Sequence, residues 1–490
     1  MTETAMVATG TDYEVVIGLE VHAQLLTKSK MFCSCSAAYN EAGPNENTCP
    51  VCLGLPGVLP VMNRQAVEFT IRTALALNCE IPPYTKFDRK NYFYPDLPKG
   101  YQISQFDLPL SQSGFLAVLV GGEVVRAGIT RVHLEEDTGT MHHAGDVLQT
   151  ATSSHIDLNR CGVPLMEIVG EPDLSTPEQA REYLVRLRQL LVYIGVNDGN
   201  LEHGSFRCDA NVSLRKRGAT ELGTKVEVKN MNSFRAVQKA LEFEIVRQTA
   251  MLDAGETIAQ ETRGWVEAKQ ATIGQRSKEF AHDYRYFPEP DLPPLEIGAD
   301  LVNRIRGELP ELPEAKGKRF VEAYGLSAYD AAILTTTQSI ADGYETIAKV
   351  ITPKVAANWM MGDVARLAND HGIELPDSGL GIDGLTKLLA MVDKGTINGA
   401  IGKQLLDELY VGGGDPDALV AERGLAQVSD SGELGTIVDE VIANNAKVVA
   451  DFQGGKDQAL QALVGQVMKA TRGRADAKLV TQLFRERLSS

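Results

Sequence analysis

Four short segments in which polar and apolar side chains alternate constrain the fold of this 490-residue chain most strongly. Successive side chains of a β-strand point to opposite faces, so residues 17–25 place Glu20 and His22 on one face and apolar residues on the other. The alternation recurs at residues 131–137, 207–215 and 224–230. This repetition predicts an antiparallel sheet with one face packed on a core and the other face polar.

The polar faces of these segments carry acids, basic residues, Asn and His. The acids and the histidine that can converge over one sheet are Glu20, His22, Glu135, Glu136, Asp209 and Glu227. Gathered carboxylates repel one another unless they hold a cation, and oxygen ligands with at most one imidazole suit Mg²⁺ or Mn²⁺. Three basic residues belong to the same segments: Arg207, Lys225 and Lys229. Their positive charges suit a phosphate-bearing substrate. The pattern therefore predicts phosphoryl transfer, with His22 either a metal ligand, a neighbour of the ligands or a structural histidine.

Cysteines form a second pattern. Four of the seven lie close together as Cys33, Cys35, Cys49 and Cys52, and two such pairs across a loop can converge on a tetrahedral zinc site. A redox pair is the alternative. Since all four ligands are Cys and no position is left open, we expect a structural zinc. We interpret the other three, Cys79, Cys161 and Cys208, as buried small apolar residues.

Residues 86–105 crowd basic, aromatic, Pro and Gly residues together without core periodicity. Such a stretch is typical of a binding loop, in which aromatic rings stack on bases while Lys and Arg hold phosphate. A packed aromatic loop is the alternative. The chain contains no GxxxxGK[ST] motif and no kinase glycine loop, so a nucleotide would bind by another route.

Helical periodicity is clearest in three places before residue 295. Helices are expected over about residues 64–77, over about residues 233–252, and from Pro177 onward with Thr176 as the cap and Gln179 reaching back to it. Residues 115–121 and 123–132, around Gly121-Gly122, predict a β-hairpin.

Four prolines within residues 288–294 form a stiff connector, and helical periodicity dominates after it. A glycine-rich stretch at residues 412–416 predicts a second hinge. The expected fold class is α+β: a disordered lead over residues 1–12, a mainly antiparallel-sheet domain over 13–295, an all-α domain over 301–412 and a small helical tail over 413–490.

Charge and composition exclude some classes of protein. A net charge of −17 argues against a protein that coats nucleic acid through its overall electrostatic field. The C-terminal tail, however, is basic. The basic residues between 465 and 490 are Lys469, Arg472, Arg474, Lys478, Arg485 and Arg487, against two acids. The sequence has no long apolar run and no leader pattern, so we expect no membrane association and a cytoplasmic location.

Several of these segments together resemble the B subunit of the tRNA-dependent amidotransferases. They are residues 17–22, residues 86–96, His133 to Asp137, Asp157 to Arg160, Arg207 to Asn211, and Lys229-Asn230 with Asn232-Ser233. The resemblance runs from about residue 13 to the end and is most specific in the first 295 residues.

This resemblance implies a heterotrimer with an amidase, the A subunit, which releases ammonia, and with a small third protein, the C subunit. The B subunit would use ATP and Mg²⁺ (or Mn²⁺) to activate the side-chain carboxyl of Glu-tRNA(Gln) or Asp-tRNA(Asn) as an acyl phosphate, and then amidate it. The implied fold is a cradle similar to glutamine synthetase and guanidino kinases, followed by a helical domain and a tail that binds tRNA.

The resemblance also implies roles for residues at matching positions. Lys90 is similar to a basic residue of the kinase pocket. The residues similar to the metal ligands and to the acids at the mouth of the ammonia tunnel are Glu20, His22, Glu135, Glu136, Asp209 and Glu227. The four-Cys zinc site occurs in only part of the family, and all four positions are filled here.

Two other hypotheses compete with this one. The first is a non-catalytic tRNA-binding scaffold, which would not need converging acids. The second is a free-standing ATP-dependent ligase that joins a small acid to an amine.

Overall fold

The computed structural model describes residues 12–143, 153–277, 283–427, 431–454, 456, 458–471 and 473–488. The chain divides into two compact units, Met1–Leu312 and Pro313–Ser490. The lead expected over residues 1–12 lies outside the described residues except for Asp12.

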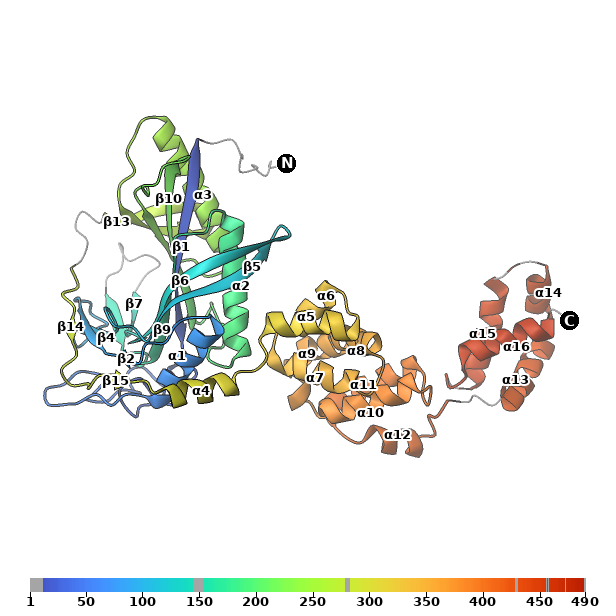
Figure 1. The fold of residues 1–490 in the computed structure, drawn as a ribbon. Coiled ribbons are helices and arrows are strands. Elements are labelled where there is room, and N and C mark those ends of the chain that lie inside the picture. The colour runs from blue at the N-terminus through green and yellow to red at the C-terminus, as the bar shows by residue number, and fades with distance from the viewer. Residues whose placement is uncertain are drawn as a thin grey trace. The chain divides into compact units, whose positions relative to one another are not determined.

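An eight-stranded sheet organises the first unit, in the order β13-β12-β11-β10-β1-β9-β6-β5 (Figure 1). Its strands are β1 (Tyr13–Gln24), β5 (Ser111–Val120), β6 (Glu123–Glu136), β9 (Pro164–Gly170), β10 (Phe206–Lys216), β11 (Val226–Lys229), β12 (Glu261–Val266) and β13 (Ala271–Ser277). Every neighbouring pair is antiparallel except β11 and β12, which are parallel. The expected antiparallel-rich sheet is therefore confirmed.

The predicted β-hairpin is also confirmed. Strands β5 and β6 pair around Gly121 and Gly122, whose φ angles are 59° and 89°. Positive φ at both turn positions matches the twist of the flanking strands and is accessible to glycine at little cost.

Helices cover one face of this sheet (Figure 1). They are α1 (Arg64–Ala76), α2 (Pro177–Tyr193) and α3 (Phe234–Asp253), close to the three predicted ranges. The Thr176 hydroxyl caps α2 as expected by accepting from the Gln179 N–H at 3.1 Å. The Gln179 side chain, however, reaches back to the backbone N–H of Ser175, not to that of Thr176.

The apolar face of β1 packs into the core that these helices close. Ile17, Leu19 and Val21 are at most 1% exposed and share a core with Leu184 and Leu187 of α2. Burial of the apolar face fixes the register of β1, because a one-residue slip would turn its polar side chains into the core.

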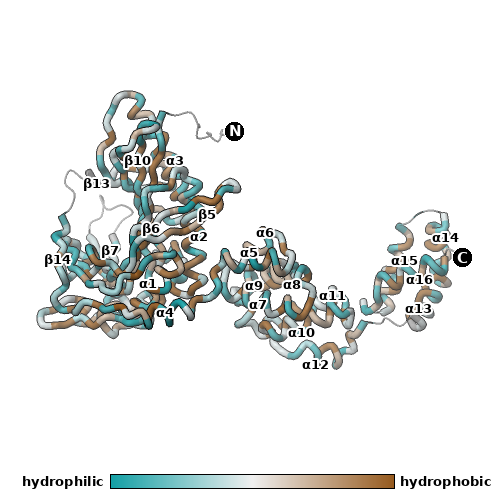
Figure 2. Tube along the Cα trace, viewed as in Figure 1, coloured by the Kyte–Doolittle hydropathy of each residue, from teal (hydrophilic) through white to brown (hydrophobic). Residues whose placement is uncertain are grey.

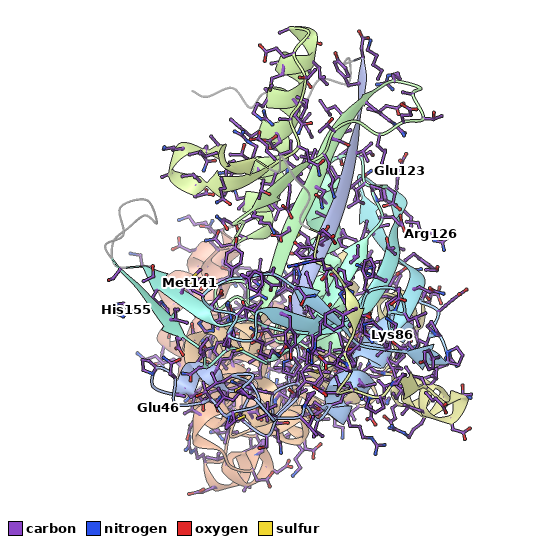
Figure 3. All side chains as sticks on the ribbon, turned by 90° about the vertical axis from the view of Figure 1, so that its left-hand side faces the viewer. Glu46, Lys86, Glu123, Arg126, Met141 and His155 are labelled. Carbon is purple, nitrogen blue, oxygen red and sulfur yellow. The ribbon has the colours of Figure 1, made fainter. Side chains whose placement is uncertain are left out.

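Smaller elements complete the first unit. A three-stranded sheet joins β14 (Phe287–Pro288), β3 (Asp88–Asn91) and β4 (Tyr101–Ser104), and β2 (Tyr84–Thr85) pairs with β15 (Leu295–Glu296). Strands β7 (Thr140–His143) and β8 (Ser154–Asp157) form a ribbon whose Met141 and His155 are labelled in Figure 3. Among the described residues, the first unit also contains helix α4 (Ala299–Glu308) and the 3₁₀ turns Tyr39–Glu41 and Glu267–Lys269.

Every regular element in the described part of the second unit is helical, as predicted. The α-helices are α5 (Pro313–Tyr324), α6 (Ala328–Leu334), α7 (Gln338–Ala348), α8 (Pro353–Trp359), α9 (Ala365–His371), α10 (Gly381–Asp393), α11 (Gly399–Gly412), α12 (Pro416–Glu422), α13 (Ser431–Asn444), α14 (Ala446–Gln453), α15 (Gln458–Ala470) and α16 (Ala477–Leu488). A π-helical turn, Met360–Val364, joins α8 to α9, and Leu375–Asp377 is a 3₁₀ turn.

The last four helices have a core of their own, which includes Leu434, Leu463 and Phe484. Hydrophobic stretches recur along these helices in Figure 2. Helix α12 belongs with the preceding helices, because it packs on α10 and the Lys387 ammonium pairs with Asp415 at 3.0 Å. The core of the last four helices starts at Leu434 of α13, and the hinge at residues 412–416 stays a prediction. Among the described residues, no helix is both long and apolar enough to span a membrane.

Candidate active site

The polar face of the eight-stranded sheet is centred on β1. Antiparallel pairing aligns one residue from each of four neighbouring strands, in the order Arg207, His22, Glu167 and His133. Glu20 lies opposite Asp209 in the next polar row. The predicted meeting of acids and histidine on one sheet face thus follows from the register.

His22, Glu135 and Glu167 form the tightest group on this face. The His22 Nε2 atom lies 3.6 Å from a Glu167 oxygen and 3.9 Å from a Glu135 oxygen. One candidate ligand atom from each side chain lies within 4.8 Å of the others. Two carboxylates and one imidazole form a donor set that suits Mn²⁺ or Mg²⁺, so these residues fit a divalent cation.

Burial makes this group electrostatically costly. Glu135 and Glu167 are 2% and 8% exposed, and His133 Nε2 lies 3.3 Å from Glu167. Burial opposes ionisation of Glu167, but the two imidazoles hold the pKa of that carboxyl well below its usual range. Burial likewise opposes protonation of His22, but the hydrogen bond and charge of Glu167, with the charge of Glu135, raise the pKa of the imidazole.

A second group of charges continues along β1, β10 and β11. The Glu20 carboxylate accepts a hydrogen bond from Asn211 at 3.0 Å, and the Lys229 ammonium lies 2.5 Å from Asp209 and 3.2 Å from Glu227. Burial raises the pKa of Glu20, as do the charges of Glu167, Asp209 and Glu227, against the opposing charge of His22. The negative charges of the two groups therefore interact electrostatically across this face of the sheet.

Lys90 brings positive charge to the His22 group from β3. Burial disfavours the charged lysine, but the carboxylates of Glu135 and Glu167 outweigh burial and raise the pKa of Lys90. Lys90 also lies 5.2 Å from the centre of the Tyr284 ring. The position of Lys90 suits contact with an anionic substrate beside the acids.

The other two predicted cations are Arg207 and Lys225. Arg207 pairs with Asp137 at 3.1 Å, so its charge is already compensated. Lys225 is exposed and precedes β11, which starts at Val226 and is shorter than the predicted strand. With Glu20 and Asn211 it lines a cavity of about 280 Å³.

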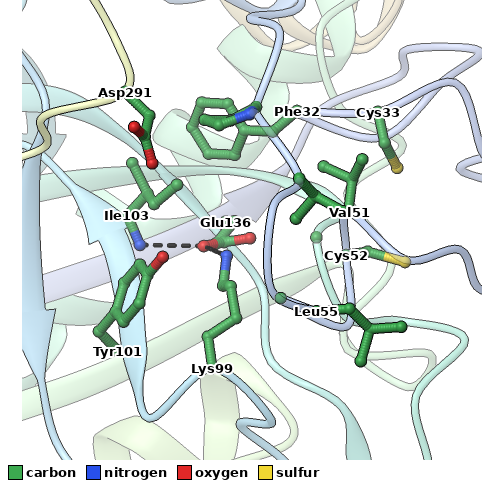
Figure 4. A pocket seen from close by; sticks show the side chains of 14 residues that line it. Phe32, Cys33, Val51, Cys52, Leu55, Lys99, Tyr101, Ile103, Glu136 and Asp291 are labelled. Carbon is green, nitrogen blue, oxygen red and sulfur yellow. Dashed lines mark hydrogen bonds and ion pairs between the residues drawn. The ribbon is translucent and has the colours of Figure 1, made fainter.

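The structure does not bring Glu136 to this group. Alternation along β6 turns Glu136 away from the face that carries Glu135. The Glu136 carboxylate accepts from the Ile103 backbone N–H at 3.0 Å and pairs with Lys99 (Figure 4). It lines a cavity of about 190 Å³ next to Cys52 and Cys33.

The four predicted zinc ligands converge. The Sγ atoms of Cys33, Cys35, Cys49 and Cys52 lie within 4.8 Å of one another. A hydrogen bond from Cys33, acting against burial, lowers the pKa of Cys52 to about 5, aided by the Cys49 N–H and by Lys30. A tetrathiolate set of this kind fits a closed, structural zinc site. Cys79, Cys161 and Cys208 are buried, as predicted.

Sequence reasoning missed Glu167 and His133. Glu167 is the single charged residue in Pro164–Gly170, an otherwise apolar strand, and an acid in such a strand is a signal of a functional group. His133 belongs to a segment whose alternation is clear, but the acids that follow it are the more conspicuous residues.

The order of polar residues along β1, β6, β10 and β11 can be compared with known proteins. The sequence model of the GatB/GatE catalytic domain matches residues 15–303. The chain belongs to this family. A second model, of the GatB domain, matches residues 342–488.

Relatives of the GatB/GatE family agree over nearly the whole length. A relative from Carboxydothermus hydrogenoformans is 54% identical over 98% of this chain and 99% of its own length. A relative from Moorella thermoacetica is 54% identical over 97% of this chain and 100% of its own length. Both are named as the B subunit of aspartyl/glutamyl-tRNA(Asn/Gln) amidotransferase, so the predicted family is confirmed.

Proposed function

We propose that this chain is the subunit that uses ATP to activate the side-chain carboxyl of Glu-tRNA(Gln), of Asp-tRNA(Asn) or of both, and then amidates it. The names of its relatives support the substrate class. The reaction class is a carbon–nitrogen ligase that takes nitrogen from glutamine. We further propose that the sheet unit is a cradle similar to glutamine synthetase and guanidino kinases.

The chemistry explains why such a subunit needs a phosphoryl-transfer site. A carboxylate is a poor electrophile because oxide is a poor leaving group. Attack of a carboxylate oxygen on the γ-phosphorus of ATP releases ADP and gives an acyl phosphate. Ammonia then displaces phosphate and forms the amide. Catalysis of the first step depends mainly on positioning and on neutralising negative charge.

The observation that carries the proposal is the buried group of His22, Glu135 and Glu167 beside Lys90. A divalent cation held by these three side chains would offset the charge on the triphosphate. Lys90 offers fixed positive charge to phosphate oxygens on the same face. Glu20, Asp209 and Glu227 extend the acidic surface, and Lys229 holds the last two in place.

Ammonia and tRNA come from outside this chain in the proposal. An amidase, as the A subunit, would release ammonia, and a small C subunit would complete the heterotrimer. The basic helical tail would contact tRNA phosphates, and the four-Cys group would hold a structural zinc.

A non-catalytic tRNA-binding scaffold remains the alternative. Acids buried on a polar sheet face argue against it, since a scaffold has no use for charges that cost free energy to bury.

The test uses the full complex, with ammonium chloride as the nitrogen source so that the amidase step is bypassed. Glu167→Gln is expected to abolish ATP-dependent conversion of Glu-tRNA(Gln) and Asp-tRNA(Asn), while tRNA affinity stays near that of the wild type. The matched control is Glu123→Gln, at the exposed tip of the β5–β6 hairpin (Figure 3). Undiminished conversion by the Glu167 variant would favour the scaffold.

A further inference from the structure

One lysine of the first unit is completely buried without an acid beside it. Lys30 is 0% exposed, and no carboxylate among the described residues forms an ion pair with it. Lysine is almost never fully buried unless an opposite charge compensates it. Lys316, the other buried lysine in the described part of the chain, pairs with Asp342 and Glu345. The compensating charge of Lys30 therefore comes from another kind of group.

The side chain of Lys30 ends at the four-cysteine group. Its Nζ atom donates to the Asn47 carbonyl at 2.8 Å and lies 3.8 Å from the Cys52 Sγ atom, within hydrogen-bond distance for sulfur. Cys52 is buried as well, so the ammonium and the sulfur meet away from water. The carbonyl accepts one of the three N–H donors but carries no net charge. The thiolate of Cys52 is the contact that can balance the ammonium.

The backbone of Lys30 fixes this contact. The Lys30 N–H donates to the Cys35 carbonyl at 2.9 Å, and the Asn63 side chain donates to the Lys30 carbonyl at 3.3 Å. Lys30 is thus tied through its backbone to the first cysteine pair. Its side chain reaches the second pair at Cys52, which is labelled in Figure 4. A single lysine therefore bridges the two halves of the group.

The charge of a filled site explains why a lysine suits this position. A zinc ion held by four thiolates carries two net negative charges, and burial of such an anion costs free energy. The Lys30 ammonium cancels one of these charges and donates to a ligand sulfur. Without the thiolates, Lys30 would itself be a buried charge with no counterion. Each charge therefore offsets the cost of burying the other.

We propose that Lys30 is the charge partner of the four-cysteine group and stabilises zinc there through its ammonium and its N–H contact with Cys52. Lys30 does not bind the metal itself, so it is a positioning residue of the zinc site. This inference rests on the zinc assignment within the proposed function and does not depend on the ATP reaction. The competing role is structural, in which Lys30 only holds the Asn47 carbonyl, with or without metal.

The first test measures the zinc affinity of the full complex by competition with the chromogenic chelator pyridylazoresorcinol. Lys30→Met keeps an apolar stem but removes the ammonium, and it is expected to weaken zinc binding by about tenfold or more, as loss of an indirect partner of a metal site does. Lys30→Gln keeps N–H donors for the Asn47 carbonyl and is also expected to lose affinity, because it lacks the charge. The matched control is Lys28→Met, which removes an exposed lysine two residues away and is expected to bind zinc as the wild type does.

Thermal unfolding of the zinc-loaded and zinc-stripped complex provides a second readout. The increase in unfolding temperature on zinc loading is expected to be smaller in Lys30→Met than in the wild type, because a ligand stabilises a fold in proportion to how tightly it binds. A lysine that only holds the Asn47 carbonyl would lower the unfolding temperature equally in both states. An unchanged increase on zinc loading would therefore overturn the proposal.

Cobalt in place of zinc tests the contact with sulfur directly. An N–H donor lowers the energy of the thiolate electrons, so its loss in Lys30→Met is expected to move the thiolate-to-cobalt charge-transfer band to longer wavelength. Lys28→Met is expected to leave the band in place. A band that does not move in Lys30→Met would show that Lys30 does not act on the thiolate, and would overturn the proposal.

The outcomes distinguish this role from the proposed function. Wild-type zinc affinity in both Lys30→Met and Lys30→Gln would overturn the role of Lys30 and leave the zinc site and the ATP reaction standing. A wild-type complex that takes up no zinc would overturn the zinc site and the role of Lys30 together. ATP-dependent amidation would still stand in that case, because its test uses the acids of the sheet.

Discussion

Glu167 lies between two imidazoles, and its position explains most of the local electrostatics. His22 on β1 and His133 on β6 approach it from the two neighbouring strands, at 3.6 Å and 3.3 Å. Its negative charge stabilises protonated His22, while a cation held there would require the neutral imidazole. Replacement of Glu167 therefore removes both a proposed cation ligand and the negative charge beside the His22 ring.

The first prediction concerns cation affinity. Glu135→Gln and Glu167→Gln are each expected to weaken Mn²⁺ binding by about tenfold or more, because loss of even an indirect partner of a metal site costs that much. Isothermal titration calorimetry of the full complex with MnCl₂ measures the Mn²⁺ affinity. Glu123→Gln serves as the control, and unchanged Mn²⁺ affinity in both variants would contradict the assigned ligands.

The second prediction concerns zinc. Elemental analysis is expected to find roughly one zinc per chain, and Cys52→Ser is expected to lose it, because a structural site needs all four ligands. Cys208→Ser, a buried cysteine outside the group, is expected to keep the metal. Zinc-free wild-type protein would show that the four thiols form only a reduced cluster.

Alternation predicted where Glu20, His22 and Glu135 lie, because strand period fixes the face of each residue. The same rule separates Glu136 from Glu135, although the two belong to one run of three acids. Glu167 and His133 could not be assigned in this way. Their significance depends on contacts between strands that are far apart in the chain, and one sequence does not show these contacts.

At the scale of elements, strand β1 lies between β10 and β9 and positions both groups of polar residues. Its alternation, the β5–β6 hairpin and three helices were predictable because each depends on local pattern and capping. The order of the strands was not predictable, because it depends on contacts between residues that are far apart in the chain, such as His22 and Glu167. The parallel pairing of β11 with β12 was likewise invisible to local pattern.

A buried ion-pair network attaches α3 to β12. Glu244 is fully buried and lies 2.8 Å from Arg247 and 3.0 Å from Arg263. Burial opposes ionisation of Glu244, but the hydrogen bond from Arg247 and then that from Thr272 hold its pKa below the ordinary value of 4.5. Loss of its charge removes one of the two carboxylates that these arginines share, because both also pair with Glu261.

The third prediction follows from this network. Glu244→Gln is expected to lower the free energy of unfolding of the sheet unit by about 2 kcal/mol, because buried hydrogen bonds to a charged group are weakened. Because the folded pKa is depressed, the stabilisation is present above the ordinary pKa of 4.5 and is lost as pH falls through the lower folded value. The difference between variant and wild type therefore shrinks under acid conditions.

Urea unfolding followed by Trp265 fluorescence, in a Trp359→Phe background, reports this region. Glu256→Gln, at an exposed position after α3, is the control. A variant that matches the wild type at neutral pH would show that the network contributes nothing.

At the scale of the whole molecule, the chain joins a sheet unit that carries the candidate site to a helical unit whose last four helices have their own core. The two family models match residues in both units. We expect the acids of the sheet to perform the chemistry and the basic tail to bind tRNA.

The fourth prediction separates these two tasks. A chain that ends at Gln427 is expected to lose about tenfold or more in tRNA affinity, because phosphate contacts dominate such binding. ATP affinity is expected to stay unchanged, since the core of α13–α16 is separate from that of the sheet. Filter binding at physiological salt measures the affinities for tRNA and for ATP. An unchanged tRNA dissociation constant would show that the tail does not bind tRNA.

The central claim is that the side-chain carboxyl is activated as an acyl phosphate. The most direct measurement supplies the full complex with ATP, ammonia and Glu-tRNA(Gln) or Asp-tRNA(Asn) whose side-chain carboxyl carries oxygen-18. Phosphate released with each amide is expected to contain a single oxygen-18 atom from the carboxylate, as mass spectrometry would reveal. Unlabelled phosphate, or oxygen-18 in AMP, would contradict the account.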